Sequence, residues 1–122
     1  MRMLLCLLVL VAAPAWAGWV KVRETKDATF YIDPATIRQD GNFRKVWEVK
    51  DLKTRTSGGE MSAKFLSEYD CKEERYRVLA LTSHSKSMAS GKIVIAGDDP
   101  SPWIAVPPNS LGEVRLKTVC AK

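Results

Sequence analysis

Cysteine and histidine are the residues of this sequence whose chemistry could be reactive or metal-binding. Its 122 residues include three cysteines and one histidine. Cys71 lies in EYDCKEERYRVL, between two runs that resemble strands, and Cys120 lies near the C-terminus. A cysteine in this setting can be a reactive thiol, a metal ligand or half of a disulfide. Which of these roles a cysteine has depends on the redox compartment of the protein, and the N-terminal sequence bears on that compartment.

The N-terminal stretch MRMLLCLLVLVAAPAWA has the three parts of a secretory signal. Arg2 supplies the positive charge, residues 4–13 form an apolar run, and Ala15-Trp16-Ala17 has the small-x-small cleavage pattern. The apolar run of about ten residues is too short for a membrane span, which needs roughly 20. We therefore predict a signal peptide over residues 1–17.

Cleavage before Gly18 leaves residues 18–122, which we interpret as one mature domain. Its sequence contains no apolar run long enough for a transmembrane segment. Cys6 lies inside the apolar run of the signal and not at its cleavage point, so we do not expect a lipid anchor. We expect an exported protein of the periplasm or the cell surface.

Export favours the disulfide interpretation of the cysteines. Cys71 and Cys120 are the two cysteines of the predicted mature chain, they form no C-x-x-C motif, and one histidine gives zinc too few partners. We therefore predict a Cys71–Cys120 disulfide and no metal or cofactor. Closing a loop of about 50 residues stabilises a fold by roughly 4 kcal/mol in the chain-entropy model.

His84 is the residue that an enzyme hypothesis would require. It lies between Ser83 and Ser85, but a Ser–His pair needs an orienting group and an oxyanion hole, and the sequence indicates neither. We expect a hydrogen-bonded surface histidine, no catalytic residues and no enzymatic activity.

The binding candidates are basic and aromatic residues. The net charge of +5 is mildly basic, and Arg75 and Arg77 alternate with Tyr76. Trp103 lies in a loop framed by prolines. Arg75, Tyr76, Arg77 and Trp103 are therefore our candidate protein-binding patch, although the same pattern also fits a solvated strand face and a tryptophan that fills a sheet edge. Export argues against a nucleic-acid partner.

The elements that must position these residues are mainly strands. Alternating or β-branched runs bounded by turn residues predict an antiparallel meander over residues 18–23, 28–32, 42–52, 61–71, 75–83 and 92–96. Asp33-Pro34 indicates a helical turn, and Asp40-Gly41 indicates a hairpin. In the run 42–52, Phe43, Trp47 and Val49 share one face; the other face carries Arg44, Val46, Glu48 and Lys50.

One helix is expected at the C-terminus. Ser110 and Glu113 match a capping box that opens a helix over about 111–120. Leu116, Val119 and Cys120 lie near one side of it, so a disulfide to Cys71 would hold this short helix on the sheet. The residues 97–102 and 107–108 are typical of loops. The fold class is therefore α+β.

Three stretches resemble the surface-adhesin protein E-like domain family of Gram-negative bacteria. They are YIDPATIRQDGNFRKVW, FLSEYDCKEERYRVL and PWIAVPPNSLGEVRLKTVC, in the order that the family has them. The resemblance implies an antiparallel sheet of about six strands with a C-terminal helix tethered by a disulfide, with Cys71 and Cys120 at the matching positions.

The resemblance also implies a function in binding. Our leading hypothesis is a non-enzymatic protein of the periplasm or cell envelope that binds a protein partner. The alternative is a surface adhesin for host extracellular matrix proteins such as vitronectin and laminin. Adhesion requires display at the cell surface, and we find no lipid-anchor cysteine at the predicted cleavage point that would provide it. Exposed sheet edges would also allow a homodimer.

Overall fold

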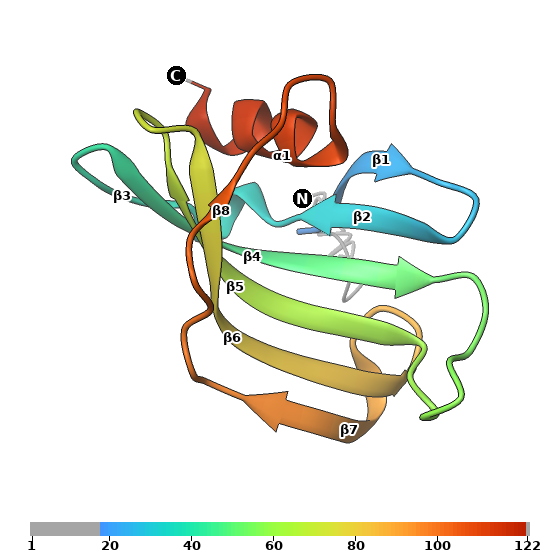
Figure 1. Cartoon of the computed structure of the whole chain (residues 1–122). Coiled ribbons are helices and arrows are strands. Elements are labelled where there is room, and N and C mark those ends of the chain that lie inside the picture. Colours follow the sequence, from blue (N-terminus) through green and yellow to red (C-terminus); the bar gives the residue numbers. More distant parts are fainter. Residues whose placement is uncertain (1–17, 122) are drawn as a thin grey trace, which may run out of the picture.

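The computed structural model describes residues 18–121, which form a curled antiparallel sheet with a helix packed across one face (Figure 1). The predicted signal peptide, residues 1–17, lies outside the described residues. The strands are β1 (Val20–Glu24), β2 (Ala28–Ile32), β3 (Arg38–Asp40), β4 (Phe43–Leu52), β5 (Ser62–Asp70), β6 (Arg75–Lys86), β7 (Ser90–Gly97) and β8 (Ile104–Ala105). A 3-10 turn, η1, spans Pro34–Thr36, and the helix α1 spans Leu111–Cys120.

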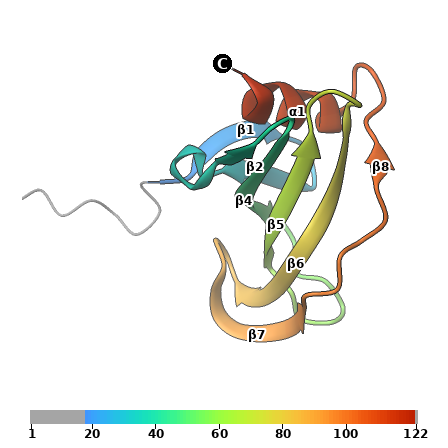
Figure 2. The same ribbon diagram turned by 90° about the vertical axis from the view of Figure 1, so that its left-hand side faces the viewer.

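The strand order is β1-β2-β4-β5-β6-β7, with β3 paired to β4 and β8 paired to β6. All pairings are antiparallel. In both views of the ribbon, α1 lies at the top of the picture and β7 at the bottom, far from the helix (Figure 2). The predicted α+β class, with about six strands in the main path and a C-terminal helix, is confirmed.

The turn signals of the sequence have structural counterparts. Gly41 has a φ of +59°, a conformation open to glycine, and it follows Asp40 in the β3–β4 hairpin. Asp33 caps η1, as its side chain accepts a hydrogen bond from the Ala35 N–H. The strand expected over 75–83 continues to Lys86, and β7 begins at Ser90, so that a tight turn joins the two strands.

The helix covers the more polar of the two faces predicted for β4. Val46 and Glu48 point toward α1 and are almost fully buried, whereas Phe43 on the opposite face is 36% exposed. The core beneath the helix consists of Ile32, Val46, Tyr69, Leu116 and Val119. A charged residue can occupy this core because its charge is paired, as described below.

Both ends of α1 are fixed to the rest of the protein. At its start, the Ser110 side chain accepts a hydrogen bond from the Glu113 N–H at 3.2 Å. Glu113 accepts in return from the Asn109 N–H, one residue before the position that the predicted capping box requires. At its end, Arg44 donates to the carbonyl oxygens of Val119 and Ala121, each at 2.7 Å. A cation at this end also suits the helix dipole.

The predicted disulfide is confirmed. Cys71 and Cys120 are bonded, and their Cα atoms lie 5.8 Å apart. Cys71 lies in the turn after β5, where its N–H also donates to the carbonyl oxygen of Asn42, and Cys120 is the last residue of α1. The bond therefore joins the C-terminal end of the helix to the β5–β6 turn.

Candidate functional site

Trp103 and two arginines form a stacked cluster on the face of the sheet opposite the helix. The guanidinium carbons of Arg75 and Arg77 lie 4.6 and 4.5 Å from the centre of the Trp103 ring. The Phe43 ring centre is 5.9 Å from that of Trp103. We call Phe43, Arg75, Arg77 and Trp103 the aromatic–arginine cluster.

The short strand β8 brings Trp103 into this cluster. Ile104 and Ala105 pair with Tyr76 and Arg75 at the start of β6, which places the residue before β8 over the arginine side chains. The sequence had predicted a proline-framed loop here, so β8 was missed. A strand of two residues is too short to give an alternating pattern.

Buried carboxylates on β5 hold the two arginines in place. Arg75 Nε lies 3.0 Å from Asp70 Oδ2, and Arg77 Nη2 lies 2.7 Å from Glu68 Oε1. The arginine side chains remain 39% and 33% exposed, whereas those of Asp70 and Glu68 are 4% and 11% exposed. The two carboxylates thus fix the guanidinium groups from the side of the sheet, while part of each arginine side chain stays accessible to solvent.

Asp70 also organises the turn that follows β5. Its Oδ1 accepts hydrogen bonds from the N–H groups of Lys72 and Glu73. Burial alone would raise the pKa of Asp70, but the hydrogen bonds from Glu73, Arg75 and Lys72 and the charge of Arg75 together lower it. The carboxylate therefore stays ionised and keeps Arg75 oriented.

The structure separates Tyr76 from the other predicted patch residues. Successive strand residues point to opposite faces, so Tyr76 lies under the helix while Arg75 and Arg77 lie on the other side. Its ring stacks on Tyr69 at 5.7 Å between centres, and the Arg115 guanidinium lies 4.9 Å from it. The patch that the sequence predicted is thus divided between two surfaces.

His84 is buried and not at the surface, which corrects our expectation. It is 8% exposed, and its Nε2 lies 2.8 Å from Thr82 Oγ1 rather than near Ser83 or Ser85. Burial lowers its pKa, and the charge of Lys64 lowers it further. The sequence Ser83-His84-Ser85 is polar and therefore indicated a surface position, but β6 continues through these residues and buries His84.

The most deeply buried charges were not predicted as a pair. Arg115 on α1 donates from Nε and Nη2 to the two carboxylate oxygens of Glu48 on β4, at 2.9 and 2.7 Å. The Tyr69 hydroxyl donates to the same carboxylate at 2.9 and 3.0 Å, and Ser67 Oγ donates to it as well. We call Glu48, Ser67, Tyr69 and Arg115 the buried network.

Charge-assisted hydrogen bonds, which are the strong kind, hold the Glu48 carboxylate of the buried network. Burial would lower the pKa of Arg115, but the hydrogen bond and the charge of Glu48 raise it well above its usual value. Burial and the Glu48 charge raise the pKa of Tyr69, which stays a neutral donor. No local pattern in the sequence indicates that Glu48 and Arg115 form a pair. The one available signal was that Glu48 is a charged residue on the same strand face as Val46.

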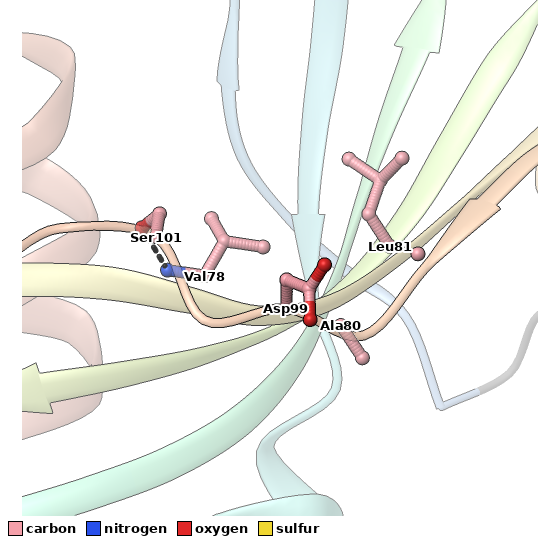
Figure 3. Close-up of a pocket in the computed structure, with 6 residues that line it drawn as sticks. Val78, Ala80, Leu81, Asp99 and Ser101 are labelled. Atoms are coloured by element: carbon pink, nitrogen blue, oxygen red, sulfur yellow. Dashed lines mark hydrogen bonds between the residues drawn. The ribbon is translucent and has the colours of Figure 1, made fainter.

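A shallow pocket of about 180 Å³ lies where β6 meets the segment after β7, and it is lined by Val78, Ala80, Leu81, Gly97, Asp99 and Ser101 (Figure 3). Ser101 fixes that segment, because its Oγ accepts from the Val78 N–H at 2.9 Å. Within residues 18–121, no group of three His, Cys, Asp or Glu side chains is placed to hold a metal ion.

The sequence matches one protein family over nearly the whole described chain. The model of the family described as surface-adhesin protein E covers residues 19–121. The chain belongs to this family. The resemblance seen in the sequence motifs is thereby confirmed, and no curated protein matches the sequence.

Solved structures of Haemophilus influenzae protein E share the fold. The chain is similar to crystal form II of Haemophilus influenzae protein E, with a TM-score of 0.70 at 12% identity, over 90% of this chain and 92% of that one. Protein E from non-typeable Haemophilus influenzae matches with a TM-score of 0.59 at 15% identity, over 91% and 82% of the two chains. At this identity the comparison establishes the adhesin E fold and does not transfer binding residues. Among residues 18–121, no helix has the length and apolar character of a membrane span.

Proposed function

We propose that this adhesin E family member is an exported, non-enzymatic protein of the cell envelope that binds a protein partner through the aromatic–arginine cluster. The observation that supports it most is the stacking of two part-exposed arginines on Trp103, above carboxylates that keep them oriented. Tryptophan and arginine are the residue types that contribute most often to the binding energy of protein interfaces. Preordered side chains lose less conformational entropy on binding.

The partner's chemistry follows from the cluster. The exposed ring of Phe43 and the half-buried ring of Trp103 would contact an apolar side chain, and the outer edges of Arg75 and Arg77 would bind a carboxylate. We therefore propose that the partner presents a protein segment with an acidic residue next to an apolar one. Host matrix proteins such as vitronectin and laminin are the alternative partners, suggested by the family resemblance.

The binding experiment compares variants of the aromatic–arginine cluster with a control variant on the same face of the sheet. Trp103→Ala and Arg77→Gln should each weaken capture of envelope or matrix proteins, and added salt should weaken it further. Trp47→Ala is a matched control, because Trp47 lies on the same face but contacts Lys64 rather than the arginines. Equal binding of the wild type and both cluster variants would exclude this surface.

Localisation distinguishes the envelope role from adhesion. We propose that the signal over residues 1–17 is cleaved before Gly18. In the experiment, a tag would be added to the C-terminus of the chain, and intact cells would be treated with an external protease. Loss of the tag indicates surface exposure and favours adhesion to matrix proteins such as vitronectin or laminin. Protection until the outer membrane is opened indicates a periplasmic partner.

We also propose a homodimer through the edge strand β7. Ile93, Val94 and Ile95 are 60%, 39% and 53% exposed on a strand with one unpaired edge, an arrangement that monomers usually avoid. Antiparallel self-pairing centred on Ile95 would set Lys92 of each copy opposite Asp98 of the other. Ile95→Lys should shift the sedimentation coefficient to that of a monomer, whereas Val20→Lys on the other edge should not. A wild type that sediments as a monomer contradicts the dimer.

A further inference from the structure

A second, unassigned pocket lies on the helix side of the sheet, away from the aromatic–arginine cluster. It has a volume of about 260 Å³ and is lined by Phe30, Lys50, Ala63, Phe65, Tyr76, Val78, Leu81 and Arg115. The walls are aliphatic and aromatic, and the two charged residues that line it are both cations. The volume is slightly below the roughly 300–1,000 Å³ typical of small-molecule sites, so a ligand would be small.

Both cations have binding capacity left. Arg115 is 7% exposed, and Glu48 occupies its Nε and Nη2, but its Nη1 has no hydrogen-bond partner among residues 18–121. Lys50 is exposed beside the pocket; its Nζ lies 5.7 Å from the Phe30 ring centre and forms no ion pair with any described residue. Glu48 balances the charge of Arg115, so Lys50 leaves the pocket with one uncompensated positive charge.

We propose that this pocket binds a small amphipathic carboxylate, such as a medium-chain fatty acid. The carboxylate would accept hydrogen bonds from Lys50 Nζ and Arg115 Nη1, and the acyl chain would contact the apolar wall that includes Phe65, Val78 and Leu81. A nucleotide or sugar would leave its many polar groups unsatisfied against these walls. A dianion would exceed the single free charge.

The position under α1 links the ligand to the helix. Arg115 belongs both to the buried network and to the pocket, so a carboxylate on Nη1 would add a third interaction to the guanidinium that fixes the helix. Ligand that binds only the folded state raises the melting temperature with concentration. Stabilisation is therefore a second readout beside binding.

The test uses octanoate, titrated into the purified oxidised protein below its micelle concentration and followed by amide chemical shifts. Saturable shifts with a Kd of roughly millimolar are expected, as suits a ligand of this size, and they should centre on Ala63, Phe65, Val78 and Leu81. Octanol, which has the chain without the charge, should bind more weakly.

Two variants and one control complete the test. Lys50→Gln should weaken octanoate binding about fivefold, the effect of losing a part-exposed ion pair. Ala63→Leu, which fills the pocket, should abolish saturable shifts. Lys45→Gln, on the same strand but the opposite face, should bind like the wild type. No saturable shifts, shifts centred on β7, or equal affinity in the Lys50 and Lys45 variants would overturn the proposal.

Discussion

Replacement of Arg115 by methionine tests how α1 is held on the sheet. The side chains of Arg115 and Glu48 are 8% and 2% exposed, so the substitution removes two charge-assisted hydrogen bonds and leaves a carboxylate buried without its cation. Breaking a buried pair in this way costs about 3–5 kcal/mol, because the remaining charge is uncompensated. That is a large share of the roughly 5–15 kcal/mol that stabilises a domain.

The free energy of unfolding would be measured by urea titration of the oxidised protein, followed by tryptophan fluorescence and circular dichroism. The variant Arg115→Met combined with Glu48→Gln should recover part of the loss. Glutamine is neutral and still accepts hydrogen bonds from Ser67 and Tyr69. The coupling energy between the two substitutions should be about 1–3 kcal/mol, as found for residues in direct contact.

The control for this experiment is Lys117→Met, which removes a cation of the same helix. The Lys117 side chain is 75% exposed, and its partner Glu113 is one helical turn away, so stability should change little. Unfolding of Arg115→Met at the wild-type urea concentration would refute the reasoning. So would losses that simply add in the double variant, because the two residues would then act independently.

Three further predictions concern other parts of the molecule. Cys120→Ser should lower the free energy of unfolding by about 2–5 kcal/mol, and mild reduction of the wild type should lower its melting temperature similarly; equal melting of oxidised and reduced protein would show that the disulfide contributes nothing. Arg44→Met should increase amide exchange at the C-terminal turn of α1 while leaving β2 protected, because the carbonyl oxygens of Val119 and Ala121 lose their donor. Since burial and Lys64 lower the pKa of His84, the folded state binds its proton less readily than the unfolded chain, whose pKa is about 6.5, so stability should fall as the pH drops from 7.5 to 5.5. His84→Gln should flatten that dependence, and an unchanged slope would assign it to other groups.

Local patterns in the sequence predicted the elements that local chemistry determines. Alternation indicated the main strands, Asp40-Gly41 indicated the hairpin, and Ser110 indicated the start of the helix. The Cys71–Cys120 disulfide was predicted from the expected export of the protein and from the number of cysteines. Each of these conclusions depends on residues close in sequence or on a small set of possible partners.

The aromatic–arginine cluster and the buried network depend on distant contacts that no local pattern contains. Arg115 and Glu48 are 67 residues apart, and their pairing requires the helix to cross β4 at one place. Trp103 reaches the arginines through a two-residue strand, which has no recognisable period. The run Arg75-Tyr76-Arg77 was a candidate binding patch in the sequence, but alternation divides it between the aromatic–arginine cluster and the core.

Strand β5 connects the aromatic–arginine cluster with the buried network. Its outward residues Glu68 and Asp70 hold the arginines of the aromatic–arginine cluster, and its inward residues Ser67 and Tyr69 donate to Glu48 beneath the helix. A slip of one residue in the β4–β5 register would place two carboxylates under α1 and expose Tyr69. The core therefore excludes that register by the same residues that orient the cluster. A partner at Trp103 would consequently contact a surface whose geometry depends on the buried network, although no residue of that network lies on the cluster's face.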